Sequence, residues 1–366
     1  AKIGNCRDQQ HDGQQCGSKD QHGYTPSHKD GARRNALLNR NHDPMDITEP
    51  CIARTFPAGS TIDHWQAPDG WPLRRLIWPA PNGAAGTEPA RGSILFLGGR
   101  GDHFEKYLES FADWSARGWQ LESVDWRGQG GSGRLSDDPN VGHVEDFSLW
   151  IADIAAYAAD WRARTPGPHV MMGHSMGGHL LMRALAEHGV TPDAAILIAP
   201  MLGFTAPYPD WLGHQVAQWM TRIGRPERAA WKASEKPGSS PKLRQTLLTH
   251  DDARYADELW WHAQNPAIVL GPPSWRWVER AYASIIDLAQ PGVLETIDVP
   301  LLILATKGDK LVSASAAARD AKRVASAQLH VYGREAAHEL LREVDAVRND
   351  ALRRIDAFLD EAAPKL

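Results

Sequence analysis

The sequence predicts an α/β protein with a mostly parallel central sheet and helices on both of its faces. Short apolar runs alternate with helix-length segments between residues 93 and 199. The run at 301–306 (Leu-Leu-Ile-Leu-Ala-Thr) is apolar throughout, which is typical of a parallel strand buried on both faces. A Gly-x-Ser-x-Gly turn follows one such run at residues 173–177. In such sheets the site lies at the carboxyl ends of the strands.

A hairpin is expected first, from Thr61–Gln66 and Trp71–Trp78, with its turn at the Pro-Asp-Gly of residues 68–70. The remaining strands are expected at 93–97, 120–124, 170–172, 194–199, 300–306 and 329–332. Helices are expected between them at 104–117, 144–163, 180–186 and 313–327.

The Gly-x-Ser-x-Gly turn carries the most chemical information. Gly173 and Gly177 lack the Cβ atoms that would clash in a sharp strand-to-helix turn, so Ser175 can project its hydroxyl clear of the sheet. The helix that follows places partial positive charge at its N-terminus, where it can stabilise an oxyanion. The alternative is a glycine-rich turn with a structural serine, and it is excluded only if Ser175 has catalytic partners.

A nucleophilic serine needs a general base, and the base needs an orienting acid. Asp309 follows the apolar run at 301–306, and His338 follows the last predicted strand. Each alone could be a turn, cap or surface residue, but both come after strands, on the same edge as Ser175, in the order Ser-Asp-His. We therefore predict a triad of Ser175, Asp309 and His338. Three competitors fit worse because they lie inside the turn, before a strand or within one: His174, Asp298 and His330.

The oxyanion hole is expected to use two backbone N–H groups. The first belongs to Met176, directly after the serine. The second comes from the glycine-rich loop at 98–103, and by position we assign it to Arg100. The Arg100 side chain is interpreted as exposed and solvated.

These motifs resemble a known family. Residues 173–178 read Gly-His-Ser-Met-Gly-Gly, residues 125–133 read Asp-Trp-Arg-Gly-Gln-Gly-Gly-Ser-Gly, and residues 337–341 read Ala-His-Glu-Leu-Leu. Over roughly residues 50 to 362, the chain is similar to serine hydrolases of the α/β-hydrolase fold that include bacterial lysophospholipases and monoacylglycerol lipases.

The loop at 98–103 distinguishes the branches of this family. Monoacylglycerol lipases usually carry His-Gly-x-Gly-Glu-His there, whereas here Gly98 replaces the first histidine and Asp102 the glutamate. The segments at 99–107, 248–255 and 271–277 are closer to the lysophospholipase L2-like branch.

The resemblance also implies the domain organisation. An insertion after the sixth strand, at 201–288, is expected to form a mostly helical cap over Ser175, between core parts at 45–200 and 289–366. The insertion holds seven of the fifteen tryptophans. We expect most of them to pack the cap onto the sheet and a minority to line an acyl pocket.

Residues 1–44 differ in composition from the rest of the chain. They contain seven Lys or Arg, four His and five Asp but a single aromatic residue, Tyr24. Such a segment cannot bury enough apolar area to offset its ordering entropy, so we predict a disordered or added extension before Met45. No metal site is expected there, because no ligand spacing recurs.

The overall composition excludes several classes of function. A net charge of −5 gives no indication of nucleic-acid binding, and no apolar run is long enough to span a bilayer. The three cysteines, Cys6, Cys16 and Cys51, lie outside the predicted catalytic core, and their odd number fits a reducing compartment. We therefore expect a cytoplasmic protein with at most transient contact with a membrane surface.

The predicted function is that of a serine esterase acting by double displacement. His338 takes the proton of Ser175, the N–H groups of Arg100 and Met176 hold the oxyanion, and Asp309 orients the imidazole while water hydrolyses the acyl-enzyme. No cofactor or metal is required. The resemblance implies a single-chain lipid ester, such as a lysophospholipid or a monoacylglycerol. The alternatives are small-ester, lactone or amide hydrolysis on the same triad, and a non-catalytic binding protein, which would not need all three residues.

Overall fold

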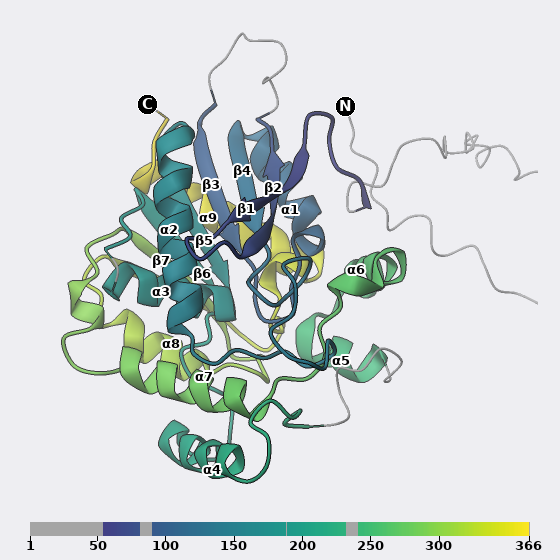
Figure 1. Ribbon diagram of the computed structural model, residues 1–366. Coiled ribbons are helices and arrows are strands. Elements are labelled where there is room, and N and C mark those ends of the chain that lie inside the picture. Colours follow the sequence, from purple (N-terminus) through teal and green to yellow (C-terminus); the bar gives the residue numbers. More distant parts are fainter. Residues whose placement is uncertain (1–53, 81–89, 188, 232–240, 366) are drawn as a thin grey trace, which may run out of the picture.

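The computed structural model describes residues 54–80, 90–187, 189–231 and 241–365. The predictions for residues 1–44 and for the three cysteines lie outside these ranges. A single eight-stranded sheet forms the centre of the described chain, in the order β1-β2-β4-β3-β5-β6-β7-β8 (Figure 1). The predicted α/β class, a mostly parallel sheet between helices, is confirmed.

The first two strands, β1 (Thr61–Gln66) and β2 (Pro72–Trp78), form the predicted antiparallel hairpin at one edge. Strand β2 is also antiparallel to β4, and the pairs beyond it are parallel. The parallel strands are β3 (Gly92–Leu97), β4 (Trp119–Val124), β5 (His169–His174), β6 (Ala194–Ile198), β7 (Leu301–Thr306) and β8 (Ala327–Tyr332).

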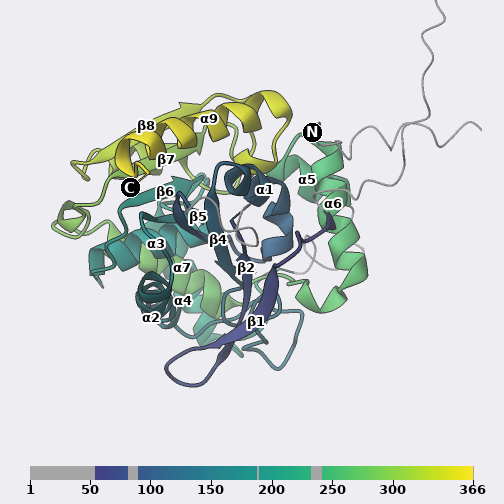
Figure 2. The same ribbon diagram turned by 90° about the horizontal axis from the view of Figure 1, so that it is seen from above.

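Helices cover both faces of this sheet (Figure 2). Strand β3 shows how the side chains divide: Ile94 and Phe96 join the core under α1 (Leu108–Ala116) and α9 (Asp345–Ala362). Leu95 and Leu97 join the core on the opposite face. The helices there are α2 (Ser148–Arg164), α3 (Met176–Glu187) and α8 (Ala314–Ala321).

Two of the predicted helices start later than expected. The segment at 104–117 begins as a 3₁₀ turn, η3 (Phe104–Tyr107), before α1. Helix α2 begins at Ser148 rather than 144, where the Asp146 carboxylate accepts a hydrogen bond of 2.8 Å from the Ser148 N–H. An Asp side chain that accepts from the backbone two residues on forms a local turn, and this turn precedes the helix.

One predicted helix is shorter than expected. Helix α8 ends at Ala321, not 327, because Ala327 already pairs with Leu301 as the start of β8. Strand pairing thus overrides the local helix propensity of the alanine-rich segment.

Among the described residues, four helices lie between β6 and β7: α4 (Asp210–Arg222), α5 (Pro241–Leu248), α6 (Asp252–Gln264) and α7 (Trp275–Leu288). Helices α4, α5 and α7 lie beyond the carboxyl ends of the parallel strands, where the predicted cap was expected (Figure 1). Short 3₁₀ turns complete the described chain: η4 (Pro266–Ile268), η5 (Leu294–Thr296) and η6 (Leu340–Arg342). No helix among the described residues is long and apolar enough to cross a membrane.

The tryptophans of this segment differ from expectation in one respect. Trp277 is buried in the core, as expected, but Trp211 and Trp219 of α4 are each 61% exposed. Helix α4 packs against α7 through its small residues, with Gly213 so close to the Tyr282 ring that a Cβ would lie 2.4 Å from it. The two large indoles are therefore on the outward face of α4.

Candidate active site

Ser175 occupies a sharp turn between β5 and α3, with a left-handed φ of 53°. A Cβ on Gly173 would lie 2.6 Å from the Gly177 carbonyl oxygen, and one on Gly177 would lie 2.4 Å from the Leu97 and Gly98 carbonyl oxygens. Both glycines are therefore required by close backbone packing, for the reason predicted from the motif. The Ser175 N–H donates a 2.9 Å hydrogen bond to the Ile198 carbonyl, which fixes the turn against β6.

The structure brings the three predicted triad residues together. His338 Nε2 lies 2.9 Å from Ser175 Oγ, and its Nδ1 lies 2.6 Å from Asp309 Oδ2. The other Asp309 oxygen accepts hydrogen bonds from the Leu311 and Val312 N–H groups at 2.7 and 3.0 Å. This is the geometry of a nucleophile, a general base and an oriented acid.

The electrostatics of the pair suit this arrangement. Burial on its own would lower the pKa of His338, but the charge of Asp309 and its hydrogen bond outweigh burial and raise the pKa above its ordinary value. Burial likewise acts to raise the pKa of Asp309, and His338 outweighs it, so that the Asp309 pKa is lowered. Asp309 is therefore ionised at neutral pH, the state in which a carboxylate can orient a neutral imidazole or stabilise an imidazolium.

The loop after β3 passes beside Ser175, since a Cβ on Gly99 would lie 3.0 Å from the Ser175 Cβ. The Gly99 N–H donates to Asp102 Oδ2 at 2.7 Å, so the loop N–H proposed for the oxyanion is that of the next residue, Arg100. Met176 begins α3, where the first N–H groups lack intrahelical acceptors. Arg100 and Met176 line the same cavity as Ser175. This position is compatible with our proposal that their N–H groups form the oxyanion hole.

The Arg100 side chain is half-buried and not exposed, so its interpretation as an exposed, solvated side chain was wrong. Its Nη2 donates to the Gly271 carbonyl, and its guanidinium lies 5.3 Å from the centre of the Trp277 ring. The segment that returns from α6 to α7 covers this side chain, which the local sequence could not reveal.

His174, one of the rejected competitors, contacts the residues around the triad. Its Nδ1 lies 3.0 Å from the Tyr107 hydroxyl and 3.1 Å from Asp102 Oδ2, and its Nε2 lies 3.4 Å from the His338 carbonyl oxygen. The His174 and His338 rings are 4.8 Å apart. His174 therefore supports the position of His338.

A buried ionic network behind the triad was missed by the sequence analysis. Lys106 Nζ donates to Asp102 Oδ1 at 2.5 Å and to Glu339 Oε1 at 2.7 Å, and it lies 3.4 Å from Glu258 Oε2. Arg342 pairs with Glu258 at 2.8 Å and also with Glu339. These groups join the loop after β3, the loop that carries His338, and helix α6. Two sequence signals for it are the i, i+4 spacing of Asp102 and Lys106 and the i, i+3 spacing of Glu339 and Arg342.

A cavity of about 280 Å³ opens above Ser175. Its lining is mainly apolar and comes from the loops after β6 and β7 and from the segment between those strands: Met201, Phe204, Trp231, Leu247, Leu248, Trp277, Leu311 and Val312. Ser175 and His338 lie in its wall. An apolar chain can therefore lie next to the serine hydroxyl.

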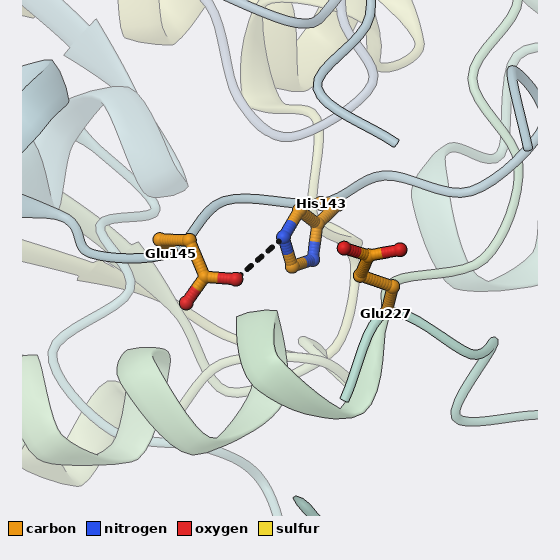
Figure 3. Close-up of side chains that lie close together, drawn as sticks. All are labelled: His143, Glu145 and Glu227. Atoms are coloured by element: carbon orange, nitrogen blue, oxygen red, sulfur yellow. Dashed lines mark hydrogen bonds and ion pairs between the residues drawn. The ribbon is translucent and has the colours of Figure 1, made fainter. Parts of the chain in front are cut away.

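In the part of the chain that the structure describes, one group of side chains has donors suited to a metal ion: His143, Glu145 and Glu227, whose ligand atoms lie within 4.8 Å of one another (Figure 3). Each carboxylate already has a cationic partner, Arg276 at 3.1 Å from Glu145 and Arg225 at 3.0 Å from Glu227. We interpret this arrangement as an ion-pair cluster between residues 143–145 and the segment after α4. The triad requires no metal, so the proposed chemistry does not involve this cluster.

The fold and the site define the class of this protein as a hydrolase of the α/β-hydrolase fold. The chain belongs to the family described as serine aminopeptidase, S33, whose sequence model matches residues 88–345. The resemblance inferred from the motifs is thereby confirmed at the level of the family.

Relatives with assigned names share most of this length. The chain is 31% identical over 278 residues to lysophospholipase L2 of Escherichia coli, covering 73% of this chain and 80% of the relative. It is 26% identical over 290 residues to a probable lysophospholipase L2 of Haemophilus influenzae, covering 78% and 87%. The family and these relatives together identify the protein as a carboxylic ester hydrolase.

Solved structures show the same fold. A soluble variant of the monoglyceride lipase from Saccharomyces cerevisiae, in complex with a substrate analogue, matches with a TM-score of 0.65 at 20% identity, covering 84% of this chain and 98% of that one. A thermostable carboxyl esterase from Bacillus coagulans, in complex with glycerol, matches with a TM-score of 0.62 at 15% identity, covering 83% and 98%.

Proposed function

We propose that this enzyme hydrolyses the carboxylic ester of single-chain lipids through an acyl-enzyme on Ser175. The observation that carries the proposal is the mainly apolar cavity that opens onto Ser175 and His338. Its volume is close to the lower end of the roughly 300–1,000 Å³ typical of ligand pockets, which suits one acyl chain rather than two. The relatives named lysophospholipase L2 and the lipase with the same fold support a lipid ester as substrate.

The mechanism follows from the hydrogen bonds of the triad. His338 removes the proton of Ser175 as its oxygen attacks the ester carbonyl, and the N–H groups of Arg100 and Met176 stabilise the oxyanion. His338 then protonates the leaving alcohol, which departs with the headgroup. Water attacks the acyl-enzyme by the same steps, with Asp309 holding the imidazole throughout.

A second candidate function is amide hydrolysis, because the matching family is described as serine aminopeptidase. The apolar cavity favours the lipid ester over a short polar peptide. A comparison of aminoacyl anilides with acyl esters of the same size distinguishes the two functions.

The test of the lipid assignment is kcat/KM for acetyl, octanoyl and myristoyl esters below their critical micelle concentrations. Each methylene buried adds roughly 0.8 kcal/mol, so kcat/KM should rise steeply with chain length until the cavity is filled. A diacyl phospholipid should react much more slowly than its lyso form. Acetyl esters as the best substrates throughout would contradict the lipid assignment.

We further propose that the enzyme reaches these substrates by transient contact with a lipid surface. Leu212, Val216, Trp219 and Ile223 recur on one face of α4 and its C-terminal end, and each is 38–61% exposed. Such an apolar stripe, with exposed arginines at 222 and 225, suits the interface of a membrane. The cavity wall also includes two exposed apolar side chains, Trp231 and Leu243, which are 43% and 65% exposed.

A further inference from the structure

Three cationic side chains line the cavity among the described residues: Arg100, Lys106 and Arg244. A cation in the wall of an otherwise apolar cavity needs a reason, because burying a charge is costly unless it is paired. The three differ in how completely their donors are used.

Lys106 and Arg100 are held by the protein. The Lys106 ammonium has three donors, and it faces the carboxylates of Asp102, Glu339 and Glu258 at 2.5, 2.7 and 3.4 Å. Its side chain is only 1% exposed. Arg100 donates to Gly271 and stacks on Trp277. Neither is free to meet a ligand.

Arg244 is different. Its Nη1 donates to Glu258 Oε1 at 2.6 Å, and no other hydrogen bond of its guanidinium is found within the described chain. The side chain is 27% exposed, and it lies on α5 in the cavity wall. A guanidinium carries five N–H donors, so most of the donors of Arg244 are not used within the described chain.

Glu258 does not depend on Arg244 alone. Its second oxygen, Oε2, accepts from Arg342 at 2.8 Å and faces Lys106 at 3.4 Å. Asp102 and Glu339, the two carboxylates that line the cavity, also have cationic partners among Lys106 and Arg342. Arg244 can therefore form an ion pair with an anionic ligand without leaving a buried carboxylate unpaired.

The charged residues of the cavity wall are linked to one another, and apolar lining comes from other loops. Lys106 pairs with Asp102 and Glu339 and faces Glu258, the partner of Arg244. Phe204 follows β6, and Val312 follows β7. An ester with its carbonyl at Ser175 can therefore place its acyl chain against the apolar loops and its headgroup near Arg244.

We infer that Arg244 binds the phosphodiester of a lysophospholipid and so makes the enzyme prefer lysophospholipids to monoacylglycerols. This inference rests on the proposed function and specifies the headgroup of the lipid substrate. Arginine suits the role because its planar fork can donate two parallel hydrogen bonds to phosphate oxygens.

The test compares octanoyl lysophosphatidylcholine with monooctanoylglycerol, both as monomers, in wild type and Arg244→Gln. The ratio of their kcat/KM values should fall by about tenfold or more in the variant, mainly through the KM for the lysophospholipid. Arg244→Lys keeps the charge and should retain part of the preference. Arg280→Gln is the matched control. Arg280 also pairs with a glutamate, Glu279, but it lies on α7 and outside the cavity wall. The ratio of the two kcat/KM values in this variant should equal that of wild type.

Equal losses on both substrates would overturn the inference, because Arg244 would then only anchor α5 to Glu258. An unchanged ratio would overturn it too. If wild type cleaves neither lipid, the proposed function itself fails, a result that is distinct from either. If Arg244→Gln does not fold, inhibition of the wild-type enzyme provides the test. Glycerophosphocholine should compete with a neutral ester substrate, and glycerol should not. Equal inhibition by the two compounds would contradict a phosphate site.

Discussion

The ammonium group of Lys106 lies 2.7 Å from Oε1 of Glu339, the residue directly after His338. The same ammonium contacts Asp102, whose other oxygen accepts the Gly99 N–H beside the proposed oxyanion donor. One buried cation thus joins the loop of the general base to the loop of the oxyanion hole. Lys106 is a positioning residue in this account, since it acts on the reaction through these loops.

Lys106→Met should therefore reduce both stability and turnover. Removing one member of a buried ion pair costs about 3–5 kcal/mol in the free energy of unfolding, because the partner charges remain buried. At a temperature where the variant is folded, kcat should fall more than KM rises, because a misplaced base and oxyanion donor weaken transition-state binding. Denaturant unfolding and steady-state kinetics measure the two effects. The exposed Lys322→Met is the control, and a Lys106→Met enzyme with wild-type kcat would show that the network has no positioning role.

The pH dependence of kcat/KM should report the His338 pKa. Because Asp309 raises that pKa above the ordinary value of about 6.5, the neutral base forms only at higher pH, and activity should rise with a midpoint above 6.5. Asp309→Asn should move the midpoint to lower pH and reduce kcat by on the order of 10⁴-fold. A profile that is flat between about pH 5 and 9 would mean that His338 is not the base.

The outward face of α4 should contribute to binding at a lipid surface. Trp219→Glu should weaken binding to phosphatidylglycerol vesicles by about tenfold or more, because a large exposed indole is lost from the contact. Hydrolysis of a monomeric ester should remain at the wild-type rate. Ile62→Glu on β1, an exposed apolar residue on a strand at the edge of the sheet, is the matched control. Co-sedimentation with vesicles that is equal for both variants would contradict the proposed surface.

The sequence predicted those parts of the site that depend on local motifs and chain order. Gly173 and Gly177 indicate the turn, and the positions of Asp309 and His338 after strands indicate the partners of Ser175. The ionic network was not predictable in this way, because Lys106 and Glu339 are 233 residues apart and meet only through the fold.

Pattern alone also could not fix where helices begin and end, or which side chains of the insertion are covered. The early end of α8 and the outward indoles of α4 follow from tertiary contacts, and the later start of α2 accompanies a local turn at Asp146. Arg100 shows the same limit, since Gly271 and Trp277 come from a segment far along the chain.

Removal of residues 1–44 should change little. A segment this polar contributes little packing to the folded protein. The melting temperature should therefore stay within about 2 °C of that of the full chain, and kcat/KM for a monomeric ester should be the same. Differential scanning calorimetry of the two proteins checks this. A fall of more than about 4 °C would show that the extension docks on the folded domain.

The central claim, an acyl-enzyme on Ser175, is tested most directly by rapid quenching of the enzyme during turnover of an octanoyl ester, followed by intact-mass and peptide mass spectrometry. The account predicts a single octanoyl group on the peptide that contains Ser175, and its absence in Ser175→Ala. The same variant should keep its fold and lose turnover by several orders of magnitude, since without a triad member only about 10³–10⁴-fold catalysis over water remains. An acyl group on another residue, or robust turnover by Ser175→Ala, would contradict the claim.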